Sequence, residues 1–378
     1  REVIAPVWRD DRLNAAEQMA IRQELGDLLT VKDHRGRIDG LLARDRFNEA
    51  ERLAEKAGVT KLVQAYAEVE RRTKKAEQAL FDVPIAQRLD AQYLLSRARY
   101  LRRKGAPKTA AREMLKIDGD KIPPSAADLI WIEQRILASD LLEEEAPQLA
   151  YELASRNVGR SKLRRIDAEF LAGWIALRKL EKPDLATPHF QRLVDLAGTP
   201  ISKARGHYWL GRALGDAPEG RQHLEIAARF DTIYYGQLAA IELGRSAIAV
   251  SHARPTRTLR VRFLRRELVQ AIAKLESARL HGMARPIYRH LARELSNPGE
   301  LALLATRAEM SGDHQLALQV GKIGFSRGLN VENLAWPIGA IPVDARTSGA
   351  GLPLAYAVAR QESTFKLDAR SAADALGL

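Results

Sequence analysis

The residue best placed to do chemistry is Glu362, an acid at the end of an apolar helical stripe. Leu354, Val358 and Glu362 recur at i, i+4 and i+8, so they share one face of a predicted helix. A carboxyl group packed against apolar side chains has little water around it, which favours its protonated form. Glycoside cleavage needs such a group as its general acid. An ordinary exposed glutamate at a helix end is the simpler alternative.

Pro353 is predicted to lie in the first turn of the helix that carries this acid, after the flexible segment Ser348–Gly351. Proline suits the first turn of a helix because its missing N–H has no partner there in any case. Arg360 lies about 200° around this helix from Glu362, so we do not expect the two to pair.

The segment around the acid carries a recognisable motif. Arg360–Ser363 is followed by an aromatic residue, Phe365, and then by Ser371–Leu378. The order, spacing and residue types resemble the opening of the catalytic domain of the soluble lytic murein transglycosylase family, which commonly reads A-R-Q-E-S-x-F-N-P, a short spacer and S-x-x-G-A-x-G-L-M-Q. Lys366–Leu367 stand where that family has Asn-Pro, and Asp374 stands where it has Gly. Both departures fall in the loop beyond the acid.

The resemblance implies a peptidoglycan lytic transglycosylase. Such a lyase cleaves the β-1,4 bond between N-acetylmuramic acid and N-acetylglucosamine without adding water and leaves a 1,6-anhydro ring. By the resemblance, Glu362 is the sole general acid and base, and Ser363 and Gln361 are candidate substrate-binding residues. No metal and no organic cofactor is implied.

The resemblance also implies partners and a location. Peptidoglycan glycan strands are the implied substrate, cell-wall synthesis or secretion proteins are further candidate partners, and the location is the periplasm after removal of a signal peptide. The family's later motifs would lie beyond Leu378. We therefore expect a chain truncated within its catalytic domain and inactive as given. The competing interpretation is a helical-repeat scaffold that binds peptides or proteins without catalysis.

Composition sets broad limits. The chain has 378 residues, a net charge of +12 and no cysteine, which excludes disulfides and thiolate metal sites. Excess positive charge attracts polyanions such as nucleic acid, acidic lipid surfaces or carboxylated peptidoglycan. The basic runs Lys74–Lys75, Arg102–Lys104 and Arg164–Arg165 lack aligned aromatic residues, so we interpret them as solvated helix faces and expect no nucleic acid partner. No stretch is long and apolar enough for a transmembrane helix.

The elements that position the acid are predicted to be helices throughout. Strong helix formers dominate, and no strand-like alternation appears. Apolar residues recur at steps of three and four from Leu163 to Leu177, and again from Leu264 through Leu268 and Ile272. Each run predicts one helix.

These helices are predicted to pair into hairpins. One pair covers residues 86–104 and 107–116, and further pairs begin near Ala126, Lys162 and Lys203, a spacing of about 36–41 residues that is typical of helical-hairpin solenoids. Small residues recur at two hairpins, where they would let helices approach closely. They are Ala98, Gly105 and Ala110 in the first and Ala308, Gly312 and Ala317 in the second.

The predicted fold class is therefore all-α: a superhelical solenoid of helical hairpins, a helical linker domain and the start of a lysozyme-like catalytic domain. Tyr208–Ala213 and Phe230–Leu243 look like the repeated helical region of soluble lytic transglycosylases, and Leu301–Gly328 looks like their linker domain. Helix-breaking stretches at Ser251–Thr258 and Trp336–Pro353 mark boundaries. We expect an α-superhelical domain at 1–255, a linker domain at 256–335 and an incomplete transglycosylase domain at 336–378.

Other sequence signals are weak or missing. The acidic run Glu143–Glu145 is interpreted as the start of a helix after Leu142, where the helix dipole favours negative charge. The sequence contains no phosphate-binding loop motif, no His-Glu-x-x-His zinc motif and no Gly-x-Ser-x-Gly nucleophile motif.

Overall fold

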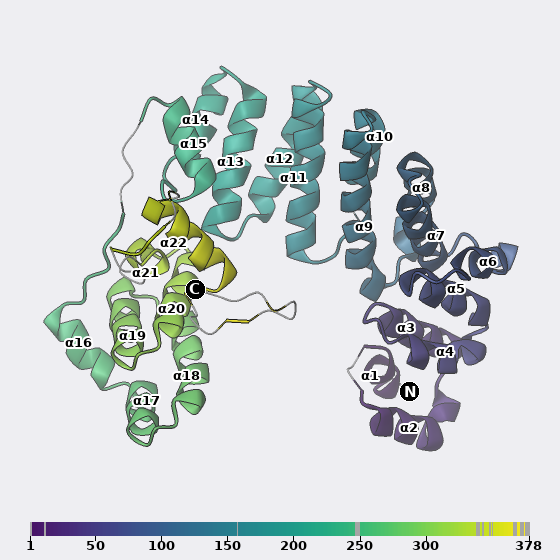
Figure 1. Ribbon diagram of the computed structural model, residues 1–378, viewed down its shortest axis with the longest axis horizontal. Coiled ribbons are helices and arrows are strands. Elements are labelled where there is room, and N and C mark those ends of the chain that lie inside the picture. Colours follow the sequence, from purple (N-terminus) through teal and green to yellow (C-terminus); the bar gives the residue numbers. More distant parts are fainter. Residues whose placement is uncertain are drawn as a thin grey trace. The chain divides into compact units, whose positions relative to one another are not determined.

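The computed structural model describes residues 2–10, 13–156, 158–245, 250–337, 341, 344–347, 349, 351–365, 369–370 and 374 (Figure 1). Within these residues every regular element is a helix and no sheet forms, so the predicted all-α fold class is confirmed. None of the helices in these ranges has the length and apolarity needed to cross a bilayer.

The chain divides into two compact units, which we describe separately. Unit 1 comprises Arg1–Leu196 with Ala213–Gly215, and unit 2 comprises Ala197–Arg212 with Asp216–Leu378. This division concerns compactness alone. The domain bounds expected at residues 255 and 335 stay predictions.

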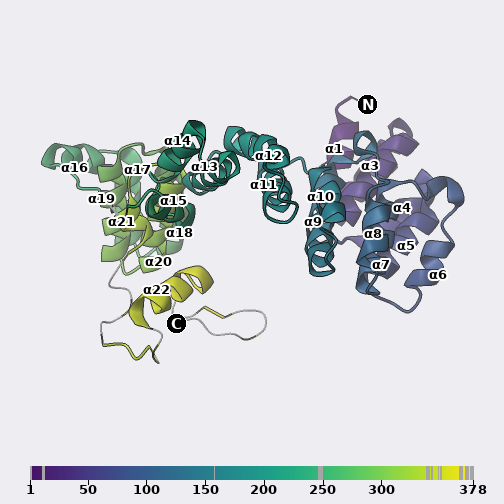
Figure 2. The same ribbon diagram turned by 90° about the horizontal axis from the view of Figure 1, so that it is seen from above.

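Unit 1 consists of helices that pair with their neighbours in sequence (Figures 1 and 2). Its α-helices are α1 (Ile4–Asp10), α2 (Ala15–Glu24), α3 (Val31–Leu42), α4 (Phe47–Ala54), α5 (Thr60–Glu70), α6 (Ala76–Phe81), α7 (Ala91–Arg103), α8 (Pro107–Met114), α9 (Pro124–Glu143), α10 (Pro147–Ser155), α11 (Lys162–Arg178) and α12 (Pro183–Leu196). The pair α7 and α8 is the hairpin predicted at 86–116, and α9 and α11 begin at or near the predicted residues.

Small residues shape the hairpin between α7 and α8. Ala98 and Ala110 are fully buried, and Gly105 has a φ of +78°, a left-handed conformation that glycine adopts without steric cost. In unit 2, Ala308 and Ala317 are buried likewise and Gly312 has a φ of +79°. The buried alanines agree with the predicted close approach, whereas Gly105 and Gly312 have open space around them and serve the turns instead.

A close approach joins α11 to α12. A Cβ atom placed on Gly173 would lie 2.8 Å from the ring of Phe190, so only glycine leaves room for that ring. Phe190 is fully buried as a result. The apolar run from Leu163 to Leu177 lies on one helix, as predicted, although Leu163 itself is exposed.

Unit 2 contains most of α13 and all later helices. They are α13 (Pro200–Leu214), α14 (Pro218–Ala227), α15 (Tyr234–Glu242), α16 (Arg257–Leu264), α17 (Glu267–Ser277), α18 (His281–Glu294), α19 (Pro298–Met310), α20 (His314–Ser326), α21 (Glu332–Ala335) and α22 (Gly351–Glu362). The helical start predicted near Lys203 is found at Pro200. The break predicted at 251–258 is found at 251–256, and its last two residues already belong to α16.

Two local predictions are wrong. The run from Leu264 to Leu275 is split between two helices, because the backbone is extended at Arg266, whose guanidinium turns to Glu300 of α19 at 2.9 Å. The acidic run begins no helix: Glu143 ends α9, Glu145 has a φ of +54°, and α10 starts at Pro147. Proline fixes the start of α10 beyond the acids.

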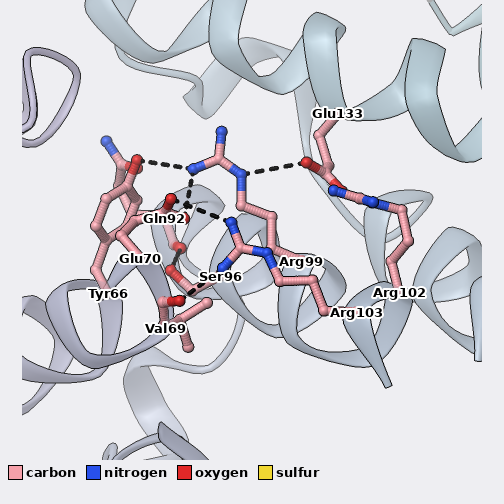
Figure 3. Close-up of polar contacts among 9 residues, drawn as sticks. All are labelled: Tyr66, Val69, Glu70, Gln92, Ser96, Arg99, Arg102, Arg103 and Glu133. Carbon is pink, nitrogen blue, oxygen red and sulfur yellow. Dashed lines mark hydrogen bonds and ion pairs between the residues drawn. The ribbon is translucent and has the colours of Figure 1, made fainter. Parts of the chain in front are cut away.

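A network of arginines and carboxylates links α5, α7 and α9 (Figure 3). Arg99 donates to Glu70 at 2.8 Å, to the hydroxyl of Tyr66 at 3.2 Å and to Glu133 at 3.3 Å. Burial alone would lower the pKa of Arg99, but Tyr66, Glu70 and Glu133 outweigh burial and raise it. Arg99 and Glu133 are both buried, so these hydrogen bonds satisfy groups that have little access to water.

The neighbouring arginines extend this network. Arg102 donates to Glu133, and Arg103 donates to the Val69 carbonyl at 2.6 Å and to Glu70 at 3.3 Å. The interpretation of Arg102–Lys104 as a solvated face is therefore wrong for Arg102, which is partly buried against Glu133 of α9, while Arg103 and Lys104 are exposed.

Candidate active site

Glu362 is the last residue of α22. Its side chain is exposed, and so is that of Gln361. The helix begins at Gly351, which has a φ of +76° and was expected to precede it, and Pro353 lies in its first turn as predicted. The candidate acid is therefore presented at a helix terminus.

The stripe that leads to the acid faces outward. Leu354 is 53% exposed and Val358 is 51% exposed, so the packing expected around this stripe is not found among the described residues. The opposite side of α22 is the buried one, where Ala359 and Tyr356 pack with Leu318 of α20. Small and aromatic residues pack the helix against its neighbours, and its larger aliphatic side chains are exposed. Glu362 is therefore exposed among the described residues, and its role stays a prediction.

Arg360 anchors α22 to the helices beneath it. Its Nε donates to the Ala335 carbonyl at 3.0 Å, and its guanidinium lies over the ring of Trp336. Burial lowers the pKa of Arg360, and burial together with the charge of Arg360 lowers the pKa of Lys322. Arg360 thus faces α21, on the side of the helix away from Glu362, as the helical spacing predicts.

Immediately after Glu362 the backbone turns sharply. Thr364 and Phe365 have φ values of +52° and +59°, unusual for residues with a Cβ atom and more so for a β-branched one. The Ala359 carbonyl accepts hydrogen bonds from the Ser363 amide at 3.2 Å and from the Phe365 amide at 3.3 Å. Gln315 of α20 donates to the Thr364 hydroxyl at 3.3 Å. These contacts end α22 at the candidate acid.

Ser363 is buried, and its hydroxyl also donates to the Ala359 carbonyl, at 3.2 Å. In this structure the hydroxyl group completes the helix end and does not face solvent. Direct substrate binding by Ser363 and Gln361 remains a prediction. The contacts of Ser363 favour a supporting position, in which it holds the turn that follows Glu362.

The second half of the sequence motif is described at few positions. Residues 366–368, 371–373 and 375–378 lie outside the described residues, and Lys366–Leu367 are among them. Asp374, which stands where the motif has glycine, has a φ of +66°, and Arg370 donates to its carboxylate at 2.8 Å. Aspartate tolerates this conformation better than most residues, so the departure keeps a backbone shape that glycine would adopt.

The described residues contain no group of three or more His, Asp or Glu side chains arranged to hold a metal ion. The polar network of unit 1 was missed by the sequence analysis, because its partners lie about 30 residues apart along the chain. It joins helices and leaves its groups engaged with one another, which is the pattern of a structural network.

The fold that carries this helix end is similar to that of a lytic transglycosylase. The solved structure is lytic transglycosylase Slt from Pseudomonas aeruginosa, an inactive mutant in which a glutamate is replaced by glutamine. The TM-score is 0.68 at 19% sequence identity, over 99% of this chain and 60% of that chain. At this identity the likeness concerns the fold, and this chain spans about 60% of the length of that structure. No protein-family model and no curated protein matches the sequence.

Proposed function

We propose that the protein is a periplasmic peptidoglycan lytic transglycosylase with Glu362 as its only general acid and base. The supporting observation is that the motif Arg360–Ser363 places an acid at the end of α22, in a chain whose fold is similar to that of Slt over nearly its whole length.

The proposed reaction uses one carboxyl group twice. As an acid, Glu362 protonates the glycosidic oxygen between N-acetylmuramic acid and N-acetylglucosamine while oxocarbenium character builds at C1. As a carboxylate, it then accepts the proton of the 6-hydroxyl group of the same muramoyl sugar, whose oxygen attacks C1. The product is a 1,6-anhydro ring, and no water is consumed.

Internal attack has a physical advantage. A hydroxyl group on the same sugar is already close to C1, so the reaction avoids the entropic cost of bringing in a second molecule. Excluding bulk water from the site suppresses hydrolysis. The N-acetyl group of the substrate can stabilise the cation, and a second protein carboxylate is then unnecessary.

The net charge of +12 suits a carboxylated glycan strand as partner. Cell-wall synthesis or secretion proteins are further proposed partners. The alternative of a helical-repeat scaffold without catalysis makes a different prediction for the acid, because replacing Glu362 would then leave every function intact.

The test compares the natural full-length protein with its Glu362→Gln variant on purified sacculi, with anhydro-muropeptides measured by chromatography. We expect turnover to fall by roughly a hundredfold or more while glycan binding persists, because glutamine keeps the shape but carries no transferable proton. Glu294→Gln is the matched control, since Glu294 is also an exposed helix-end acid, on α18. Wild-type turnover in Glu362→Gln would refute the role of the acid, and no product from wild type would refute the proposed function.

A further inference from the structure

Helix α16 lies at the edge of unit 2 and is exposed around most of its circumference (Figures 1 and 2). Phe263 is its one fully buried residue, and Leu259 packs toward Gly299 at the start of α19. An eight-residue helix held on one narrow side leaves a broad outer face, which we define by Arg257, Arg260, Val261, Leu264 and Arg265.

The outer face of α16 is basic. Two arginines of this region, Arg262 and Arg266, pair with the buried carboxylate of Glu300, at 3.9 Å and 2.9 Å, although their own side chains are 64% and 41% exposed. Arg257, Arg260 and Arg265 are exposed and form no ion pair within the described residues. The nearest acid along the chain, Glu267, is exposed and offsets one of these three charges.

Aliphatic side chains stand among these arginines. Val261 is 46% exposed and Leu264 is 51% exposed. Leu264 also lines a cavity of about 450 Å³ together with Arg260 and Met310, which is 85% exposed at the end of α19. The face therefore combines fixed positive charge with apolar groups that no part of the described structure covers.

The acid that lines this cavity, Glu276, is paired with other residues. It accepts hydrogen bonds from Arg307 at 2.6 Å and from the Tyr288 hydroxyl at 2.6 Å. Glu276 therefore does not pair with Arg260, which is exposed.

We propose that the outer face of α16 binds the surface of an anionic phospholipid bilayer. Arginines attract the headgroups, and the aliphatic side chains enter the boundary between headgroups and acyl chains. Nucleic acid fits less well, because single strands are held by exposed aromatic rings and the one ring of this helix, Phe263, is buried. An acidic polysaccharide offers only scattered methyl groups and sugar C–H faces, and no hydrocarbon layer that Val261, Leu264 and Met310 could enter. The proposal does not rest on the proposed function, since α22 lies elsewhere on unit 2 (Figures 1 and 2).

Co-sedimentation of the whole chain with vesicles tests the proposal. We expect binding to vesicles of phosphatidylglycerol and phosphatidylcholine, and at least about tenfold weaker partitioning to phosphatidylcholine alone. The triple variant Arg257→Gln, Arg260→Gln, Arg265→Gln should bind the anionic vesicles at least about tenfold more weakly than wild type. The matched control is Arg52→Gln, Arg112→Gln, Arg135→Gln, which removes the same charge from exposed arginines of unit 1 and should bind like wild type.

A second variant separates a bilayer from a simple polyanion. Val261→Ser with Leu264→Ser keeps every charge, so it should weaken vesicle binding several-fold while leaving the retention on an anionic ion-exchange resin unchanged. Equal losses of vesicle binding in both arginine triple variants would overturn the proposal, because the net charge of the chain would then explain the binding. Unchanged vesicle binding by the serine variant, or tighter binding to duplex DNA than to vesicles at equal salt, would also overturn it.

Discussion

The guanidinium group of Arg360 lies over the indole ring of Trp336, with its central carbon 5.1 Å from the ring centre. Trp336 in turn meets Phe325 of α20 edge to face, with 4.5 Å between ring centres. This stack fixes α22, and with it Glu362, to the helices beneath.

Removing the ring should therefore loosen α22. We expect Trp336→Leu to raise the amide hydrogen exchange of residues 351–362 roughly fivefold, since a partly buried cation–π contact contributes about 1 kcal/mol. Trp174→Leu removes a comparable stack, with Lys179, in unit 1 and should leave this segment unchanged. Equal exchange of α22 in wild type and Trp336→Leu would show that the apolar contacts of Ala359 and Phe365 suffice.

The buried pair of Arg99 and Glu133 gives a stability prediction. Arg99→Met should lower the free energy of unfolding by about 3 kcal/mol, because it leaves the Glu133 carboxylate buried with one fewer partner. Urea denaturation followed by circular dichroism measures the loss. Arg135→Met on the exposed side of α9 is the control and should change little. A loss for Arg99→Met as small as that of the control would mean that Arg102 satisfies Glu133 alone.

Gly173→Ala should destabilise unit 1 by about 1–3 kcal/mol, because its Cβ would press on the Phe190 ring at 2.8 Å. Thermal unfolding reports the change. Phe190→Leu removes the clashing ring atoms, so the stability change of the double variant should differ from the sum of the changes in Gly173→Ala and Phe190→Leu. A change equal to that sum would show that the strain does not come from this contact.

A histidine pair predicts the direction of a pH effect. The Nδ1 atoms of His207 on α13 and His223 on α14 lie 2.8 Å apart. Burial, the charge of His223 and the charge of Lys203 lower the pKa of His207 from 6.5 to about 4. Between pH 6.5 and 4 the imidazole of His207 is protonated in the unfolded chain and neutral in the folded chain. The contribution of His207 to the free energy of unfolding is therefore present above pH 6.5 and is lost as the pH falls toward 4.

The comparison of wild type with His207→Gln isolates this contribution. The difference in free energy of unfolding should shrink or reverse in favour of the variant between pH 6.5 and 4.5, and should be constant above pH 7. If the free energy of unfolding of wild type rose relative to that of the variant as the pH falls, the lowered pKa of His207 would be contradicted.

The hairpin architecture was predictable because its signals are local. Gly105 and Gly312 mark turns, and small residues such as Ala98 and Ala308 mark contacts, within about 20 residues of their partners. The end of α16 and the start of α10 were predicted at the wrong residues. Arg266, within the predicted apolar run, interrupts the first helix, and Pro147, after the acidic run, sets the start of the second.

The orientation of α22 was harder to predict. Both of its faces carry apolar residues, and the sequence favours the larger pair, Leu354 and Val358, as the buried one. In the structure Ala359 and Tyr356 are instead the residues that pack in the apolar cluster with Leu318 of α20. The carboxylates that hold Arg99 and Arg103 were likewise unpredictable, since helix periodicity does not report which distant helix comes alongside.

The left-handed turn at Thr364 and Phe365 has a mechanical consequence. A helix end that frays would let its terminal side chain wander over several ångströms, but here the Ala359 carbonyl is shared by the two amides and one hydroxyl that follow it. Extending the helix by one residue would break that sharing, and unwinding it would release Phe365 from its apolar contacts. The backbone thus holds the end of α22 at one position. Glu362 keeps its place by the covalent path of the chain, even though its own side chain touches little.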